Sequence, residues 1–152
     1  MYRNILLAYD GSTDGREALC QGAKLAKLCQ AEVQLVAVVT TTQGVAMAEA
    51  VYPSAECIER DLAEARRVLE EGAAHLQAHG LTVTSYLRHG EPVDQIASIA
   101  RQVGADLIVV GHREQGTLAR WWRGSVGASL LANAPCNVLV CVMPCQSESD
   151  EQ

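Results

Sequence analysis

Three short runs of apolar residues constrain the fold of this chain most strongly. They occupy residues 5–9, 33–39 and 107–110, and each is bounded by polar residues or glycine. Runs of this length are typical of strands that are buried on both faces of a parallel sheet. The segments between them carry apolar residues at helical spacing. Because strands that alternate with helices require right-handed crossovers, the sequence predicts a parallel sheet covered on both faces.

Two further segments complete the predicted sheet. Residues 81–87 alternate apolar and polar side chains, which indicates a strand exposed on one side and therefore an edge. Residues 137–143 form another mostly apolar run and are interpreted as the last strand. Five strands fit an open parallel sheet in the order 3-2-1-4-5, a Rossmann-like α/β fold with helices on both faces.

The helices have recognisable ends. Asp14 and Glu17 resemble a capping box, so we expect the first helix to begin near residue 14. The longest helix is expected to bury Ile58 and Leu62 and to end at Gly80 in the left-handed conformation.

Length and composition narrow the class of protein. The chain has 152 residues and a formal net charge of −6, which disfavours nucleic acid as a partner. We expect one domain over residues 1–144 and a disordered acidic tail over residues 145–152. No apolar run approaches the roughly 18 residues of a membrane span, and the start of the chain does not resemble a signal peptide. Six cysteines without a Cys-x-x-Cys motif are consistent with reduced thiols in the cytoplasm.

The predicted strand order indicates where a ligand would bind. In such a sheet, ligands bind beyond the carboxyl ends of the strands, where the winding direction reverses, here between strands one and four. Asp10, Val38 and Gly111 each stand at the carboxyl end of a predicted strand near this point. Asp10 can accept hydrogen bonds from a ribose or base, and Val38 offers an apolar wall for a purine. The sequence therefore predicts a nucleotide crevice.

The loop that follows Gly111 is the expected phosphate site. It closes at Gly124 and Ser125, where a second apolar pattern begins. Ser125 can cap the next helix, and the free N–H groups and dipole of a helix start favour an anion.

Three segments resemble the universal stress protein family: residues 5–12, residues 105–111, and the Gly-Ser-Val of residues 124–126. The resemblance covers residues 2 to about 143. It implies an open sheet of the adenine nucleotide alpha hydrolase-like type, a homodimer, and, in one branch of the family, bound ATP.

The family's nucleotide signature is Gly-x-x-Gly, nine residues, then Gly-Ser or Gly-Thr. Gly111, Gly124 and Ser125 match this signature, whereas Glu114 stands where the second glycine belongs, and Asn137 stands where the family often has proline. The resemblance implies ATP as cofactor, with Mg²⁺ as a possible companion, bound by these residues: Ala8, Asp10, Val38, Gly111, Arg113, Gly124, Ser125 and Val126.

An alternative keeps the fold and removes the ligand. A carboxylate at position 114 would repel a phosphate about 4 Å away by roughly 1 kcal/mol in water and 4 kcal/mol at an intermediate dielectric. The chain would then be a dimeric interaction or protective protein with an empty crevice. Asp10 also has a structural alternative as a cap or loop residue beside the first helix. The structural alternative for the glycines is that they only shape the turn from strand to helix.

An enzyme is disfavoured. No Gly-x-Gly-x-x-Gly follows the first strand, no Gly-Lys-Ser or Gly-Lys-Thr is present, and we expect no catalytic residue, although slow ATP hydrolysis stays open. His75 and His79 have a spacing that can bind metal, but we interpret them as surface residues. A redox role for Cys145 is a further alternative.

The last strand predicts a partner. It is rich in aliphatic residues and lacks lysine and internal proline, which leaves its edge open to pairing. We expect a homodimer through Val138, Val140 and Val142, and a further protein partner that the sequence does not identify.

Overall fold

The computed structural model describes residues 1–39, 54–112 and 130–142. Its helices and strands, in chain order, are β1 (Asn4–Ala8), α1 (Thr13–Cys29), β2 (Glu32–Val39), α2 (Ala55–Ala78), β3 (Val83–His89), α3 (Pro92–Val103), β4 (Leu107–Gly111), α5 (Leu130–Asn133) and β5 (Asn137–Cys141). The five strands form one parallel sheet in the order β3-β2-β1-β4-β5. This confirms the predicted fold and strand order. The predicted tail, residues 145–152, lies outside the described residues.

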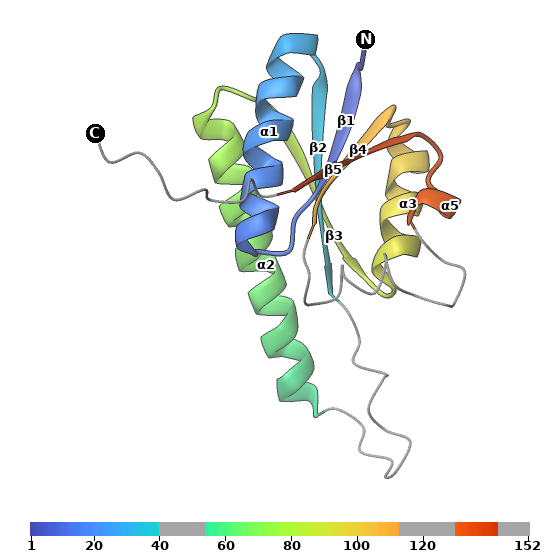
Figure 1. Cartoon of the computed structure of the whole chain (residues 1–152). Coiled ribbons are helices and arrows are strands. Elements are labelled where there is room, and N and C mark those ends of the chain that lie inside the picture. Colours follow the sequence, from blue (N-terminus) through green and yellow to red (C-terminus); the bar gives the residue numbers. More distant parts are fainter. Residues whose placement is uncertain (40–53, 113–129, 143–152) are drawn as a thin grey trace, which may run out of the picture.

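Two apolar layers lie on opposite faces of the sheet. Helices α1 and α2 cover one face, and α3 and α5 cover the other (Figure 1). Successive side chains of β1 alternate between the layers, so that Leu7 packs under α1 and α2 whereas Leu6 packs on the α3 side. Both leucines are fully buried. Burial on both faces explains why the central strands are continuous apolar runs.

The start of α1 differs from the sequence prediction. The N-cap is Ser12, whose Oγ accepts a hydrogen bond from the N–H of Gly15 at 3.0 Å, and the helix begins at Thr13. Asp14 lies inside the first turn. The capping box at Asp14 was therefore wrong, because the helix begins before Asp14 and Ser12 is its capping residue.

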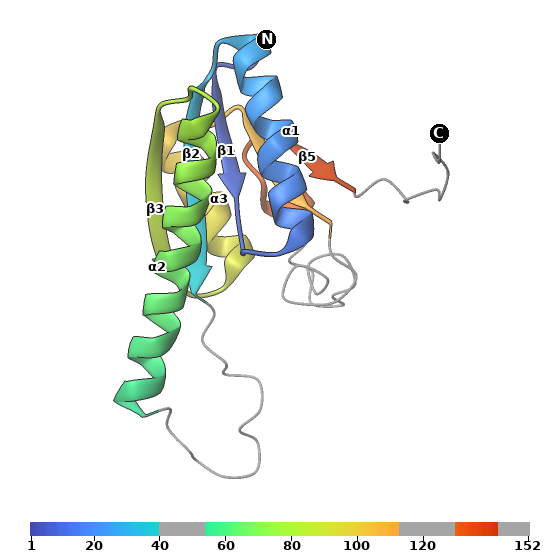
Figure 2. The ribbon, with the colours of Figure 1, turned by 90° about the vertical axis from the view of Figure 1, so that its left-hand side faces the viewer.

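Helix α2 is longer than the sheet that it covers. Its 24 residues span about 36 Å, whereas strands of 5 to 8 residues span about 17–26 Å. Its N-terminal half consequently extends past the carboxyl ends of the strands (Figures 1 and 2). Burial along α2 begins at Val68, and Ile58 is 43% exposed. The prediction that Ile58 is buried was therefore wrong, and Leu62 is half-buried.

The predicted edge strand is confirmed at the outer side of β2, two residues later than expected. Gly80 has φ +80°, and the N–H of Leu81 donates to the carbonyl of Leu76, so this part of the chain belongs to the end of α2. None of the helices in the described ranges is long and apolar enough to cross a membrane.

Candidate functional site

Strands β2, β1 and β4 lie side by side and end at the same edge of the sheet. Ala8 pairs with Val36, and Leu7 pairs with Val109. The N–H of Tyr9 donates to the carbonyl of Val36 at 3.0 Å, which carries the pairing of β1 with β2 past the end of β1. The chain leaves β1 toward α1 on one face, whereas α5 follows β4 on the other face. The winding direction therefore reverses between β1 and β4, as predicted.

Gly111 holds the end of β4 against the first turn of α1. A Cβ atom at this position would lie 2.6 Å from the carbonyl oxygen of Asp14 and 3.0 Å from the backbone nitrogen of Gly15. A separation of 2.6 Å is shorter than real Cβ atoms tolerate, 3.0 Å is already tight, and both neighbours are backbone atoms. The position consequently requires glycine for close packing, which is a structural reason independent of any ligand.

Asp10 organises the turn between β1 and α1. Its Oδ1 accepts hydrogen bonds from the N–H of Ser12 at 2.9 Å and from the Ser12 hydroxyl. Ser12 in turn caps α1, so Asp10 orients the capping residue. A Cβ at Gly15 would lie 2.8 Å from Asp10 Oδ1, and Gly11 has φ +80°, which favours glycine. Asp10 therefore has the structural role that the sequence left as an alternative.

Ala8 and Val38 lie on the other face of the same edge. Both are half-buried and pack with the layer under α3. Val38 follows Val36 by two residues and therefore points to the same face. The two side chains form an apolar surface on the α3 side, next to the polar turn at Asp10.

The structure therefore brings together Ala8, Asp10, Val38 and Gly111. The other predicted site residues, Arg113, Gly124, Ser125 and Val126, lie outside the described residues, as does Glu114.

Sequence reasoning missed the residues that shape this turn. Ser12 and Gly15 belong to the site's framework, and the signal for them was a serine two residues after an acidic residue with a glycine three residues later. No cluster of three or more potential metal ligands occurs in residues 1–39, 54–112 and 130–142.

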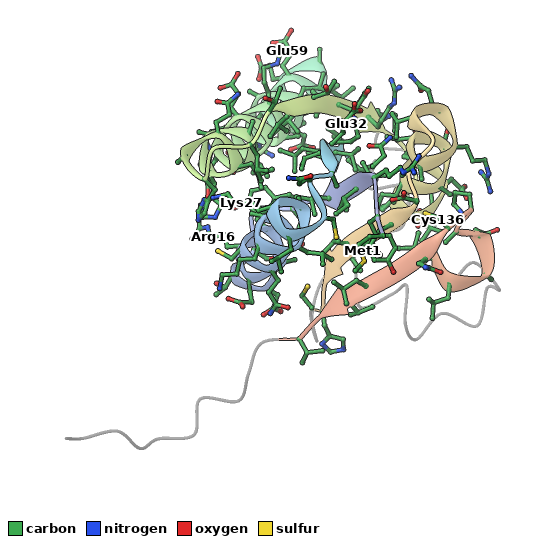
Figure 3. All side chains as sticks on the ribbon, turned by 90° about the horizontal axis from the view of Figure 1, so that it is seen from above. Met1, Arg16, Lys27, Glu32, Glu59 and Cys136 are labelled. Atoms are coloured by element: carbon green, nitrogen blue, oxygen red, sulfur yellow. The ribbon has the colours of Figure 1, made fainter. Side chains whose placement is uncertain are left out.

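A buried tyrosine next to the site joins β1 to α2. Tyr9 is 3% exposed, and its hydroxyl donates to Glu71 Oε1 at 2.9 Å. Arg16 Nε donates to the same carboxylate at 3.0 Å and to the Tyr9 oxygen at 3.3 Å. Burial raises the pKa of Tyr9, and the hydrogen bond from Tyr9 together with that from Arg16 lowers the pKa of Glu71. Figure 3 shows Arg16 on the side of α1 that faces α2.

Comparison with known proteins assigns the chain to a family. The family model described as the universal stress protein family matches residues 1–141. The chain belongs to this family. Its relative YxiE, a universal stress protein of Bacillus subtilis, is 30% identical over 149 residues, covering 92% of this chain and 99% of YxiE. The resemblance stated from the sequence is confirmed.

Solved structures of universal stress proteins share the fold. A family member from Burkholderia pseudomallei is 29% identical with a TM-score of 0.69, covering 91% of this chain and 95% of its own. The universal stress protein from Archaeoglobus fulgidus in complex with dAMP is 24% identical with a TM-score of 0.66, covering 92% of this chain and 98% of its own. Because the Archaeoglobus protein is only 24% identical to this chain, the similarity between them establishes a shared fold and nothing further.

Proposed function

We propose that this universal stress protein binds an adenine nucleotide at the carboxyl edge of its sheet, and that the nucleotide is ATP, accompanied by Mg²⁺. The observation that carries the proposal is the reversal of winding between β1 and β4, which places Asp10 and Gly111 at the same carboxyl edge of the sheet. Open α/β sheets bind their ligands at this point. The Archaeoglobus relative with dAMP supports the proposal, because the same fold holds an adenine nucleotide there.

Different residues of the proposed site would bind different parts of the nucleotide. In the proposed complex, the apolar surface of Ala8 and Val38 receives the purine ring, and Asp10 accepts a hydrogen bond from the ribose. The phosphates would bind along the segment that begins at Gly111, with Arg113 supplying positive charge. Gly124, Ser125 and Val126 would supply backbone N–H groups at a helix start. If Mg²⁺ is bound, it would neutralise charge on the phosphates.

We propose a regulatory role in the stress response rather than an enzymatic one. The described residues of the site are an apolar surface, a capping aspartate and a close-packed glycine. This set suits holding a ligand, and it contains no side chain arranged to activate a nucleophile. Bound nucleotide would alter the surface offered to a protein partner.

A second candidate function is a universal stress protein with an empty crevice. Two observations favour it: Asp10 and Gly111 have structural roles without a ligand, and Glu114 replaces the second glycine of the nucleotide signature. Both functions predict the same fold, so binding itself must be measured.

The test measures nucleotide directly. The purified protein is denatured and the released small molecules are separated by chromatography, and the nucleotide-free protein is titrated with ATP and with dAMP, each with and without Mg²⁺. We expect about one adenine nucleotide per chain or saturable binding that is tightest for ATP. Absence of both would overturn the proposal in favour of the empty crevice.

A pair of variants locates the binding. Val38→Asp places a carboxylate on the apolar surface and should abolish binding. Val83→Asp is the matched control, because Val83 is also a half-buried strand valine but stands at the amino end of β3. Equal binding by both variants would place the nucleotide elsewhere.

We also propose a cytoplasmic homodimer. All five cysteines within the described residues are free thiols, as expected in a reducing compartment. Strand β5 ends the sheet order, and Val142 beyond it is 60% exposed. The edge formed by Val138, Val140 and Val142 could pair with its copy in a second chain.

A further inference from the structure

Helices α1 and α2 run in the same direction and contact each other through a row of polar pairs. Arg16 Nε lies 3.0 Å from Glu71 Oε1. One helical turn further along both helices, Cys20 Sγ lies 3.3 Å from His75 Nε2. The second pair places a nucleophilic side chain within hydrogen-bonding distance of a base, and neither residue belongs to the proposed nucleotide site.

The His75 ring is in contact with the ring of its neighbour on α2. The ring centroids of His75 and His79 are 4.6 Å apart, and His79 Nδ1 lies 2.8 Å from the carbonyl oxygen of His75. A nucleophile and a base thus lie within hydrogen-bonding distance, and a second imidazole is in contact with the base.

The surroundings favour the unprotonated form of His75. Partial burial and the neighbouring His79 lower the pKa of His75, while Glu71 acts in the opposite direction. On α1, Arg16 and Lys24 stand one turn on either side of Cys20. A neutral imidazole can accept the proton that Cys20 must lose to become a thiolate, the reactive form of cysteine.

The other cysteines differ from Cys20. Among the hydrogen bonds between described residues, that of Cys20 is the one that joins a cysteine to an imidazole. Cys29 and Cys57 are half-buried on the same two helices, and burial raises the pKa of Cys136 and of Cys141. Cys20 is also half-buried, so part of the residue is exposed to solvent.

We propose that Cys20 is a modification site that forms a mixed disulfide with a low-molecular-weight disulfide, with His75 as the proton acceptor. Cys20 Sγ loses its proton to His75 Nε2 and attacks one sulfur of the small disulfide. The original S–S bond breaks as the new one forms, and the leaving thiolate takes the proton from His75. One thiol and one disulfide are consumed, and one mixed disulfide and one small thiol are produced.

The experiment follows each cysteine separately. The reduced full-length protein is incubated with glutathione disulfide as the probe, and adducts are quantified over time by peptide mass spectrometry between pH 6 and pH 9. We expect Cys20 to react at least about tenfold faster than Cys29 at pH 7. The Cys20 rate should persist to lower pH than the Cys29 rate and should fall as His75 becomes protonated.

Two controls separate the base from other effects. The first control is Cys57, which lies in the first turn of α2, where the helix dipole alone can favour a thiolate. His75→Asn should reduce the Cys20 rate to that of Cys29, whereas His89→Asn, at an exposed position on β3, should retain it. Thermal unfolding of both variants monitors folding.

Two outcomes would overturn the proposal. They are a Cys20 rate equal to that of Cys29 and a Cys20 rate unchanged in His75→Asn. If His75→Asn also loses stability while its Cys20 rate is unchanged, the pair only packs the two helices together. The outcome of the nucleotide-binding test does not depend on any of these results.

Discussion

The hydroxyl of Tyr9 donates a hydrogen bond to the Glu71 carboxylate at 2.9 Å, although 62 positions separate the two residues in the chain. This contact joins the end of β1 to α2, next to the turn that holds Asp10. It stabilises the framework of the proposed nucleotide site through a buried polar group.

Removal of this hydroxyl should destabilise the fold. Tyr9→Phe leaves the ring in place and deletes a part-buried hydrogen bond, so we expect a loss of about 1 kcal/mol in the free energy of unfolding, measured in urea. Tyr2→Phe is the control, because the Tyr2 oxygen accepts an exposed hydrogen bond from Asn137, and its loss should be smaller. Equal losses of stability in Tyr9→Phe and Tyr2→Phe would show that burial does not strengthen the hydrogen bond of Tyr9.

Glu71 should make stability depend on pH in the acid range. Its pKa in the folded protein is lowered by the hydrogen bond from Tyr9 and by Arg16, whereas an unfolded glutamate has a pKa of about 4.3. A group with a lowered folded pKa contributes stability above the unfolded pKa and loses it as pH falls through the folded pKa. Urea midpoints should therefore decline below about pH 4.3, and Glu71→Gln should flatten this decline.

Glu70→Gln is the matched control for that prediction, because Glu70 is an exposed neighbour on the same helix. An identical acid profile for both variants would show that Glu71 does not carry the effect.

Gly111→Ala should destabilise the protein because the new Cβ would meet backbone atoms of α1 at 2.6 Å. We expect a loss of about 1–3 kcal/mol, measured by chemical denaturation. Gly22→Ala is the comparison, since a Cβ there meets the end of the Leu7 side chain and alanine favours the helix. Gly22→Ala should lower the free energy of unfolding by less than Gly111→Ala does. A larger loss for Gly22→Ala would mean that the end of β4 can move away from α1 and accommodate a Cβ at position 111.

Glu114→Gly should strengthen nucleotide binding. Removing a carboxylate near a phosphate recovers about 1 kcal/mol or more, which corresponds to an approximately fivefold lower Kd for ATP in calorimetry. Glu114→Gln removes the charge and keeps the side chain, so the two variants separate repulsion from steric exclusion. Unchanged affinity in both would remove Glu114 as an obstacle.

Val142→Lys should weaken the proposed dimer. The residue is 60% exposed directly after the edge strand, and a charge there would disfavour pairing of two copies. Light scattering after size exclusion should show a lower mass than for the unmodified protein at tens of micromolar. Leu28→Lys, at an 83% exposed position on α1, should leave the mass unchanged. A monomer before any substitution would refute the dimer.

The sequence predicted the sheet and the switch point correctly because both depend on local patterns. The apolar runs at residues 5–9 and 107–110 mark strands buried on both faces, and connection rules leave few orders for five such strands. Asp10 and Gly111 follow those strands directly, so their meeting at one edge followed from the order.

Details that depend on competition between neighbouring groups were not predictable in the same way. Ser12 and Asp14 are both good capping residues, and the choice of Ser12 depends on the hydrogen bond from its N–H to Asp10. Ile58 fits the apolar face of α2, yet it is exposed because the helix is longer than the sheet beneath it. Helical periodicity does not record the length of the surface that a helix meets.

The amino-acid sequence by itself determined the family, the order of the strands and the edge at which a ligand would bind, since burial leaves a periodic record along the chain. The tertiary structure alone decided that Gly111 packs on Asp14, that Tyr9 binds Glu71 and that Cys20 meets His75. Each of these contacts joins elements far apart in the chain, and each depends on how one helix lies against another element. That relative placement is a property of the packed core as a whole, and no local pattern encodes it.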